Sequence, residues 1–217
     1  MFHRIPHKDQ SIEGIRDTTK YLNSHRRFNR WQFKSFLKRL SALNIDGRYL
    51  EIGSGPGLLA AEIASVRPEV DITAVELSPE MVSLAQDQIA ERKLEGRVRF
   101  LAGSADDETL LGGLGKFSLV YSTFSLHHWE KPVDAFRSLY NAVADGGVLL
   151  IHDLCRVWWL YMLPLNGGFI RSVRAAYRPK ELKQMLQQAG VSPFTIETSF
   201  PRFEISVLSR KRPSSKH

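Results

Sequence analysis

Cysteine is nearly absent from this chain of 217 residues, in which Cys155 is the only one. A single thiol excludes an internal disulfide framework and any zinc site built from several cysteines. The adjacent histidines His127 and His128 also lack the i, i+4 spacing and the third ligand of a helical zinc site. The sequence therefore predicts no metal centre.

Long apolar runs are missing as well. No stretch approaches the roughly 20 residues that a helix needs to span a bilayer, and Met1–Pro6 lacks the apolar core of a signal peptide. We therefore expect a cytoplasmic protein. With 43% hydrophobic residues, the chain can build one well-buried core but is short for two independent domains.

Acidic residues are outnumbered, with 23 Asp and Glu against 30 Lys and Arg, which gives a net charge of +7. The basic residues gather in segments 26–39, 156–180 and 210–216. This asymmetry fits either an anionic partner or a solvated face that aids solubility. Nucleic acid is the less favoured partner, because aromatic side chains are not spaced along a groove as base stacking requires.

The most informative segment is Tyr49–Leu58, which reads as a buried strand (48–52), a glycine turn and the start of a helix (58–65). Glycines in the turn would open the backbone to a ligand, and the helix start offers unpaired N–H groups to a carboxylate or phosphate. The alternating glycines are Gly53, Gly55 and Gly57.

The glycine spacing favours one class of nucleotide ligand. A dinucleotide fingerprint needs glycine at the sixth position of the turn, where this chain has Leu58. The string Glu-Ile-Gly-Ser-Gly-Pro-Gly over residues 51–57 instead resembles motif I of the class I S-adenosylmethionine-dependent methyltransferases. In that motif an acidic residue, here Glu51, closes the first strand.

A second strand, predicted over 72–76, ends in Glu76 about 20 residues past the turn. Both hydroxyls of a ribose can donate to one carboxylate, and a charged acceptor gives the stronger hydrogen bonds. Glu76 is therefore our main candidate for holding a ribose. The alternative is that Glu76 only caps the helix that opens at Ser78.

Short apolar runs alternate with helical stretches along the chain, which predicts a doubly wound, mostly parallel sheet. Asp145-Gly146-Gly147 is expected to stop a helix before a strand over 148–153, and two strands within 193–209 form a hairpin. The resemblance implies a Rossmann-like seven-stranded sheet with this antiparallel hairpin at its C-terminus. The predicted divisions are an N-terminal helical cap (1–45), a methyltransferase domain (46–210) and a disordered basic tail (211–217).

Leu126-His127-His128-Trp129, after a strand over 117–122, resembles a string common after the fourth strand of this family. It indicates the small-molecule branch typified by quinone and sterol methyltransferases. Either histidine is a candidate catalytic base, because the carboxyl end of this strand faces the crevice of an open α/β sheet. His152 and Asp153 end the fifth strand in a similar position. The alternative is that one histidine packs under the loop while the other is solvated.

The resemblance implies S-adenosyl-L-methionine as cofactor. After the third strand the family often has Gly-Asp-Ala, whereas this chain has Gly103-Ser104-Ala105-Asp106, so the contact to adenine is weaker or moves to Asp106. Plain helix capping is the alternative for Asp106 and for the adjacent Asp107. The expected cofactor-binding residues are Glu51, Gly53, Ser54, Gly55, Gly57, Glu76, Leu77, Ser104, Ala105, Asp106 and Ser122.

The segment 154–179 holds five aromatic residues and four arginines but no acidic residue. It predicts a lid over a small, apolar or anionic methyl acceptor, a peripheral membrane contact of the same composition, or a packed helix with snorkelling arginines. Cys155 within it reads as a buried apolar group. We therefore predict a methyltransferase for a small molecule; RNA methylation and a non-catalytic binding protein of this fold are the alternatives.

Overall fold

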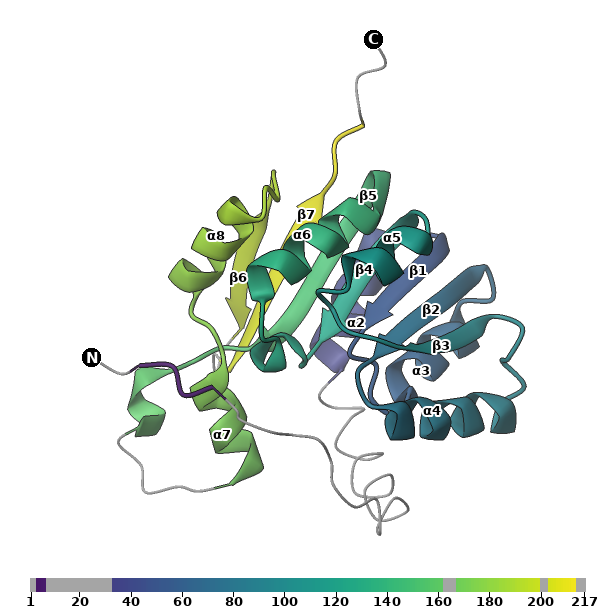
Figure 1. Ribbon diagram of the computed structural model, residues 1–217, viewed down its shortest axis with the longest axis horizontal. Coiled ribbons are helices and arrows are strands. Elements are labelled where there is room, and N and C mark those ends of the chain that lie inside the picture. The colour runs from purple at the N-terminus through teal and green to yellow at the C-terminus, as the bar shows by residue number, and fades with distance from the viewer. Residues whose placement is uncertain (1–2, 7–32, 162–166, 200–202, 214–217) are drawn as a thin grey trace. The chain divides into compact units, whose positions relative to one another are not determined.

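The computed structural model of the protein describes residues 3–6, 33–161, 167–199 and 203–213 (Figure 1). The chain divides into two compact units, residues 10–104 and residues 105–217 with 1–9. We call them the glycine-turn unit and the C-terminal unit. Most of the predicted N-terminal cap and the end of the basic tail lie outside the described residues, so the division into cap, domain and tail stays a prediction.

The glycine-turn unit is a three-stranded parallel sheet with helices. Its strands form the order β3-β2-β1, with β1 and β2 buried along most of their length, and α3 and α4 pack against β2 and β3. Strands buried on both faces read as continuous apolar runs, which is why the sequence reveals them. The elements are α2 (Lys34–Leu43), β1 (Gly47–Ile52), α3 (Leu58–Val66), β2 (Val70–Glu76), α4 (Pro79–Glu91) and β3 (Val98–Ala102).

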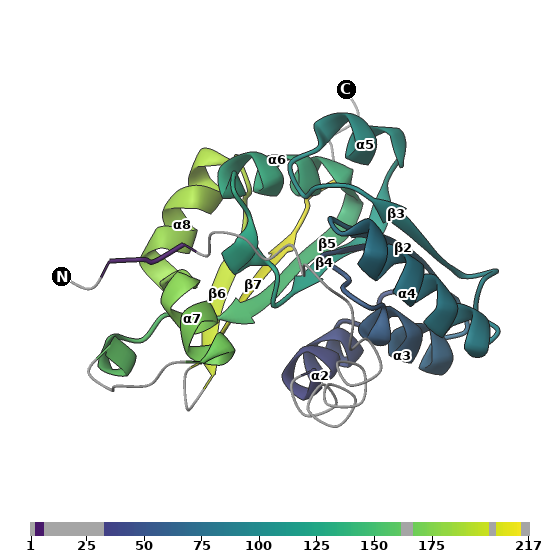
Figure 2. The ribbon, with the colours of Figure 1, turned by 60° about the horizontal axis from the view of Figure 1, so that its bottom comes forward.

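The C-terminal unit has strands in the order β4-β5-β7-β6, with β4 and β5 parallel and β7 antiparallel to both of its neighbours. Helix α6 packs against β4, β5 and α8, as Figure 2 shows from a second side. The elements are α5 (Glu108–Gly113), β4 (Phe117–Thr123), η1 (Leu126–His128), α6 (Pro132–Ala142), β5 (Val143–Leu154), η2 (Trp158–Tyr161), α7 (Gly168–Ala175), α8 (Pro179–Gln188), β6 (Thr195–Ser199) and β7 (Glu204–Arg210).

The predicted fold class is confirmed. The described residues form seven strands, all pairings within the units are parallel except those of β7, and β6 and β7 form the expected C-terminal hairpin. The structure adds that β7 lies inside the sheet, between β5 and β6. Among the described residues, no helix is both long and apolar enough to cross a bilayer.

One predicted boundary is wrong. The expected turn at residues 145–147 lies inside β5, which begins at Val143, and the pairing with β4 is irregular there. A Cβ at Gly147 would lie 2.9 Å from the Ala144 carbonyl oxygen and 3.0 Å from that of Phe117. The glycines therefore serve a bulge that brings backbones close together, and sequence alone does not distinguish this from a turn.

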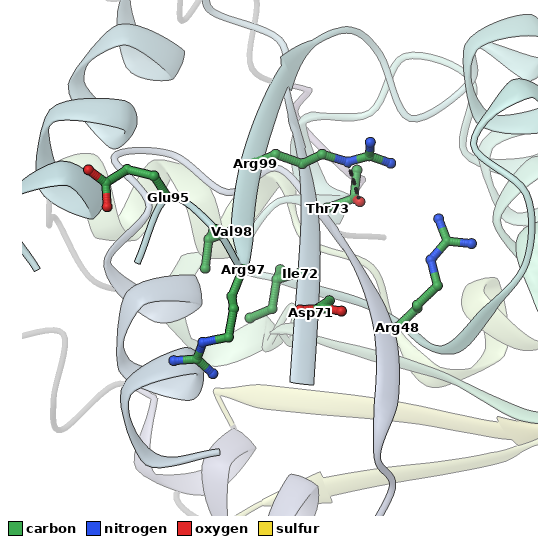
Figure 3. A pocket seen from close by; sticks show the side chains of 9 residues that line it. Arg48, Asp71, Ile72, Thr73, Glu95, Arg97, Val98 and Arg99 are labelled. Carbon is green, nitrogen blue, oxygen red and sulfur yellow. Dashed lines mark hydrogen bonds between the residues drawn. The ribbon is translucent and has the colours of Figure 1, made fainter. Parts of the chain in front are cut away.

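A hollow of about 250 Å³ lies at the amino ends of the strands in the glycine-turn unit, lined by Arg48, Asp71, Thr73, Arg97 and Arg99 among others (Figure 3). It is at the opposite strand ends from the glycine turn. Figure 3 shows Arg97 pointing away from the other two arginines. Its guanidinium donates to the carbonyls of Arg67 (3.0 Å) and Ala64 (2.6 Å), at the carboxyl end of α3.

We predict that Arg97→Met lowers the free energy of unfolding by about 1–3 kcal/mol, because two carbonyls at a helix C-terminus lose a charged donor. Arg99→Met is the matched control. Its Nε donates to Thr73 from an exposed position, so we expect a change within about 0.5 kcal/mol. Urea unfolding measures both, and equal losses would contradict the capping role of Arg97.

Candidate active site

The turn after β1 depends on left-handed backbone. Gly53, Gly55 and Gly57 have φ angles of 70°, 51° and 73°, a region that costs other residues energy. The N–H of Gly53 still donates to the Val75 carbonyl (2.8 Å), so the turn begins as a continuation of the β1–β2 ladder. The chain therefore leaves the sheet after Ile52 and reverses direction into α3 within five residues.

Gly55 and Gly57 differ in the space around the position that a Cβ atom would occupy. A Cβ at Gly55 would meet no atom within 4 Å, so the backbone there is open. A Cβ at Gly57 would lie 2.7 Å from the Phe100 ring and 2.9 Å from Ala85 Cβ. This corrects the expectation that all three glycines open the backbone to a ligand, because at Gly57 the protein's own packing requires the glycine.

The Glu76 carboxylate bridges the turn and the start of α4. Its Oε2 accepts the N–H of Gly55 (2.8 Å) and its Oε1 accepts the N–H of Ser78 (3.1 Å). The contact at the start of the helix is thus observed, since Ser78 is the N-cap of α4, while the ribose contact of Glu76 stays a prediction. Each carboxylate oxygen has a second lone pair, so the half-buried group can still accept two hydroxyls.

Other predicted residues of this unit lie nearby in sequence. Ser54 is buried, and its Oγ has no hydrogen-bond partner among the described residues. Glu51 is 1% exposed, Leu77 is 73% exposed beside Glu76, and Ser104 is half-buried after β3. An open backbone, a fixed carboxylate and an orphaned buried hydroxyl fit a polar nucleoside ligand such as S-adenosylmethionine.

The residues predicted to lie near the adenine and at the end of the fourth strand, from Ala105 onward, belong to the C-terminal unit. Ala105 is buried and Asp106 half-buried, while the cap of α5 is Asp107, whose Oδ1 accepts the Leu110 N–H (2.9 Å). The capping alternative is therefore correct for Asp107. Ser122 in β4 is fully buried, and its Oγ has no partner among the described residues, which makes it a second orphaned hydroxyl.

His127 forms a buried pair with Asp153 at the end of β5. His127 Nδ1 lies 2.7 Å from Asp153 Oδ1, Asp153 Oδ2 accepts the His127 backbone N–H (3.0 Å), and each side chain is 3% exposed. A carboxylate at Nδ1 holds the proton there and leaves the lone pair of the neutral ring on Nε2. His128 is exposed, its ring centroid 4.0 Å from that of His127, as the solvated alternative predicted.

The sequence indicates Asp153 only by its place at the end of the fifth strand, and it does not predict the pairing with His127. The available signal was that strands β4 and β5 pair in parallel, with Thr123 opposite His152, so that the residues following each strand meet. Between them Phe124 has φ 51°, strained for a non-glycine residue, and its ring packs edge-on against His152 at 5.2 Å. Such strain gathers where function constrains the backbone.

Cys155 is 6% exposed, and burial raises the pKa of its thiol although the charge of Arg156 opposes the shift. The thiol is therefore neutral and enclosed, as expected of an apolar packing group and not of a nucleophile. Among the residues that the structure describes, no cluster of three or more His, Cys, Asp or Glu side chains could hold a metal ion.

The fold and the glycine turn define a nucleoside-binding α/β protein, and comparison with known proteins assigns the family. The family described as Methyltransferase domain matches residues 24–194. The chain belongs to this family, and it is an S-adenosylmethionine-dependent methyltransferase, as the resemblance implied.

Among curated relatives, the ubiquinone/menaquinone biosynthesis C-methyltransferase UbiE of Ectopseudomonas mendocina is 26% identical over 184 residues, 78% of this chain and 71% of the relative. The magnesium-protoporphyrin O-methyltransferase of Rhodobacter capsulatus is 26% identical, covering 97% and 89%. The solved plantazolicin methyltransferase BpumL, in complex with SAH, shares the fold with a TM-score of 0.67 at 16% identity, covering 90% of each chain.

The two glycines make a matched pair for testing the turn. We predict that Gly55→Ala costs about 1 kcal/mol of unfolding free energy through φ strain alone but weakens S-adenosylmethionine binding at least about tenfold, because the new methyl occupies the open cradle. Gly57→Ala should cost about 2–4 kcal/mol, since overpacking adds to the strain. Urea unfolding and isothermal titration separate these effects, and equal destabilisation by both variants would contradict the assignment.

Proposed function

We propose that this methyltransferase acts on a small, apolar or anionic acceptor, and that the turn around Gly55 with Glu76 holds the cofactor. The observation that carries the proposal is the bond from the Gly55 N–H to the Glu76 carboxylate, which fixes an acceptor pair beside open backbone. When bound, S-adenosylmethionine supplies a methyl carbon on a positively charged sulfur. The cytoplasmic location expected from the sequence belongs to the same proposal.

The residues of the glycine turn bind and orient the cofactor. Glu76 accepts hydroxyl hydrogens on the lone pairs that Gly55 and Ser78 leave free, and Gly55 lets the ligand approach the main chain. The buried Ser54 hydroxyl can bond a polar group of the ligand that reaches it. Since displacement at an activated methyl gains most from alignment, rigid positioning is the main contribution expected of these residues.

On the acceptor side we assign His127 as the general base and Asp153 as the residue that positions it. His127 would take a proton at Nε2 from an acidic O–H, N–H or C–H of the acceptor, while Asp153 keeps the ring oriented through Nδ1. The names of two relatives point to quinone biosynthesis and to magnesium-protoporphyrin. Quinones and porphyrins have flat, largely apolar rings, which agrees with the class of acceptor that the sequence predicts.

Glu76→Gln tests the cofactor assignment by isothermal titration with S-adenosylmethionine. The amide keeps the size of the side chain but removes the charge, so we expect an affinity loss of about ten- to a hundredfold. Glu80→Gln is the control, because Glu80 is exposed at the start of the same helix and accepts a hydrogen bond from Ser78 Oγ (2.6 Å). Unchanged affinity in a folded Glu76→Gln variant would remove Glu76 from the site.

Asp153→Asn tests the base. On the best acceptor from a screen of quinols and phenols, we expect kcat to fall at least about a hundredfold at neutral pH while the affinity for S-adenosylmethionine stays the same. Raising the pH, which ionises a phenolic acceptor without help, should restore part of the rate. Glu130→Gln makes the same chemical change at an exposed position two residues past His128 and should leave kcat unaltered. A pH-independent loss would indicate that Asp153 is only structural.

A further inference from the structure

Exposed apolar side chains concentrate in one region of the C-terminal unit. Six large hydrophobic side chains are exposed among the described residues: Ile5 (55%), Val66 (71%), Leu77 (73%), Trp158 (59%), Trp159 (38%) and Phe169 (48%). Four of these six lie in the segments 3–6, 158–161 and 168–175. We call the surface formed by Ile5, Trp158, Trp159 and Phe169 the Trp158 patch.

Hydrogen bonds join these segments although they are far apart in sequence. The Ile5 N–H donates to the Arg174 carbonyl (3.2 Å), Arg4 Nε donates to the Ala175 carbonyl (2.6 Å), and the Tyr161 hydroxyl donates to the His3 carbonyl (2.9 Å). Figure 1 shows residues 3–6, in purple, beside α7 and the short helix η2. The patch is therefore a composite surface of three segments.

Two of the three aromatic rings of the Trp158 patch, those of Trp159 and Phe169, are held in place by a ring beneath them. Trp159 and Phe169 both pack edge-on against Phe203, with centroids 5.4 Å and 5.9 Å away. Phe203 itself packs on the buried cluster of Leu154, Leu160, Val173 and Ala176. The exposed ring surface is thus presented by a fixed base, so the rings cannot turn inward without losing these contacts.

The charged side chains within the three segments of the patch have one sign. Residues 3–6, 157–161 and 167–176 include Arg4, Arg171 and Arg174 and contain no acidic residue. Arg171 is exposed, and the guanidinium of Arg174 lies 5.5 Å from the Tyr161 ring centroid. Tryptophan and phenylalanine flanked by arginine suit the boundary of a bilayer with anionic headgroups, where rings enter the headgroup region and cations stay at the phosphates.

We propose that the Trp158 patch docks the protein on the surface of an anionic lipid bilayer. A monomeric soluble surface seldom groups several exposed aromatic rings, and the surrounding cations select a negatively charged partner. Docking is peripheral, since the patch inserts side chains and not a helix. The proposal stands apart from the methyl-transfer assignment, because lipid binding needs neither cofactor nor acceptor.

Vesicle cosedimentation of the full chain tests this proposal, with phosphatidylcholine vesicles compared with vesicles that also contain phosphatidylglycerol. We expect binding to the anionic vesicles that weakens as salt is raised, and little binding to neutral ones. Trp158→Ala and Phe169→Ala should each weaken binding about three- to tenfold, and Arg171→Gln about threefold. The exposure of Trp158, Phe169 and Arg171 makes these variants compatible with folding.

Val66→Ser and Arg92→Gln are the matched controls, because both residues are exposed but lie in the other unit. They should bind vesicles like the unaltered protein. Absence of vesicle binding, or equal losses in variants and controls, would overturn the proposal. So would a dimer that light scattering detects for the unaltered protein and not for Trp158→Ala, since the patch would then cover a second copy of the chain.

Discussion

The bond between the Gly55 N–H and the Glu76 carboxylate is the contact on which the proposed cofactor site depends. It ties the end of β2 to the turn that follows β1, at a place where the backbone is left-handed and lacks a side chain. Without that bond the turn would lose an acceptor for its N–H, and the carboxylate would lose the orientation that directs its second lone pairs. In the proposed site, the Glu76 carboxylate therefore both holds the turn and binds the cofactor.

The sequence predicts those elements of the fold that follow from the periodicity of apolar residues and from the residue types found in turns. Local signals exist for buried strands such as β1 and β2, for the proline at the start of α4 and for the C-terminal hairpin, and the structure confirms them. Helix α5 has no such signal, because six residues with two glycines show no apolar period and the helix starts from its Asp107 cap. The bulge at Gly147 likewise depends on the neighbouring strand.

In the candidate site, too, some features have a local signal in the sequence and others depend on tertiary structure. Glu76 could be selected from its place at the end of a strand, but its simultaneous bonds to Gly55 and Ser78 depend on tertiary structure. Gly57 looked like a ligand position because it continues the alternation, whereas Phe100 and Ala85 explain it by packing. Asp153 could not be paired with His127 from sequence, since 26 residues separate them and the strand register brings them together.

Backbone amide NMR during titration with S-adenosylhomocysteine tests the central claim most directly. If the ligand's hydroxyls share the Glu76 carboxylate with the protein, the N–H resonances of Gly55 and Ser78 should show the largest shifts in the glycine-turn unit, because both donate to that carboxylate. Shifts confined to the hollow around Arg48 and Arg99, with Gly55 and Ser78 unmoved, would contradict the account.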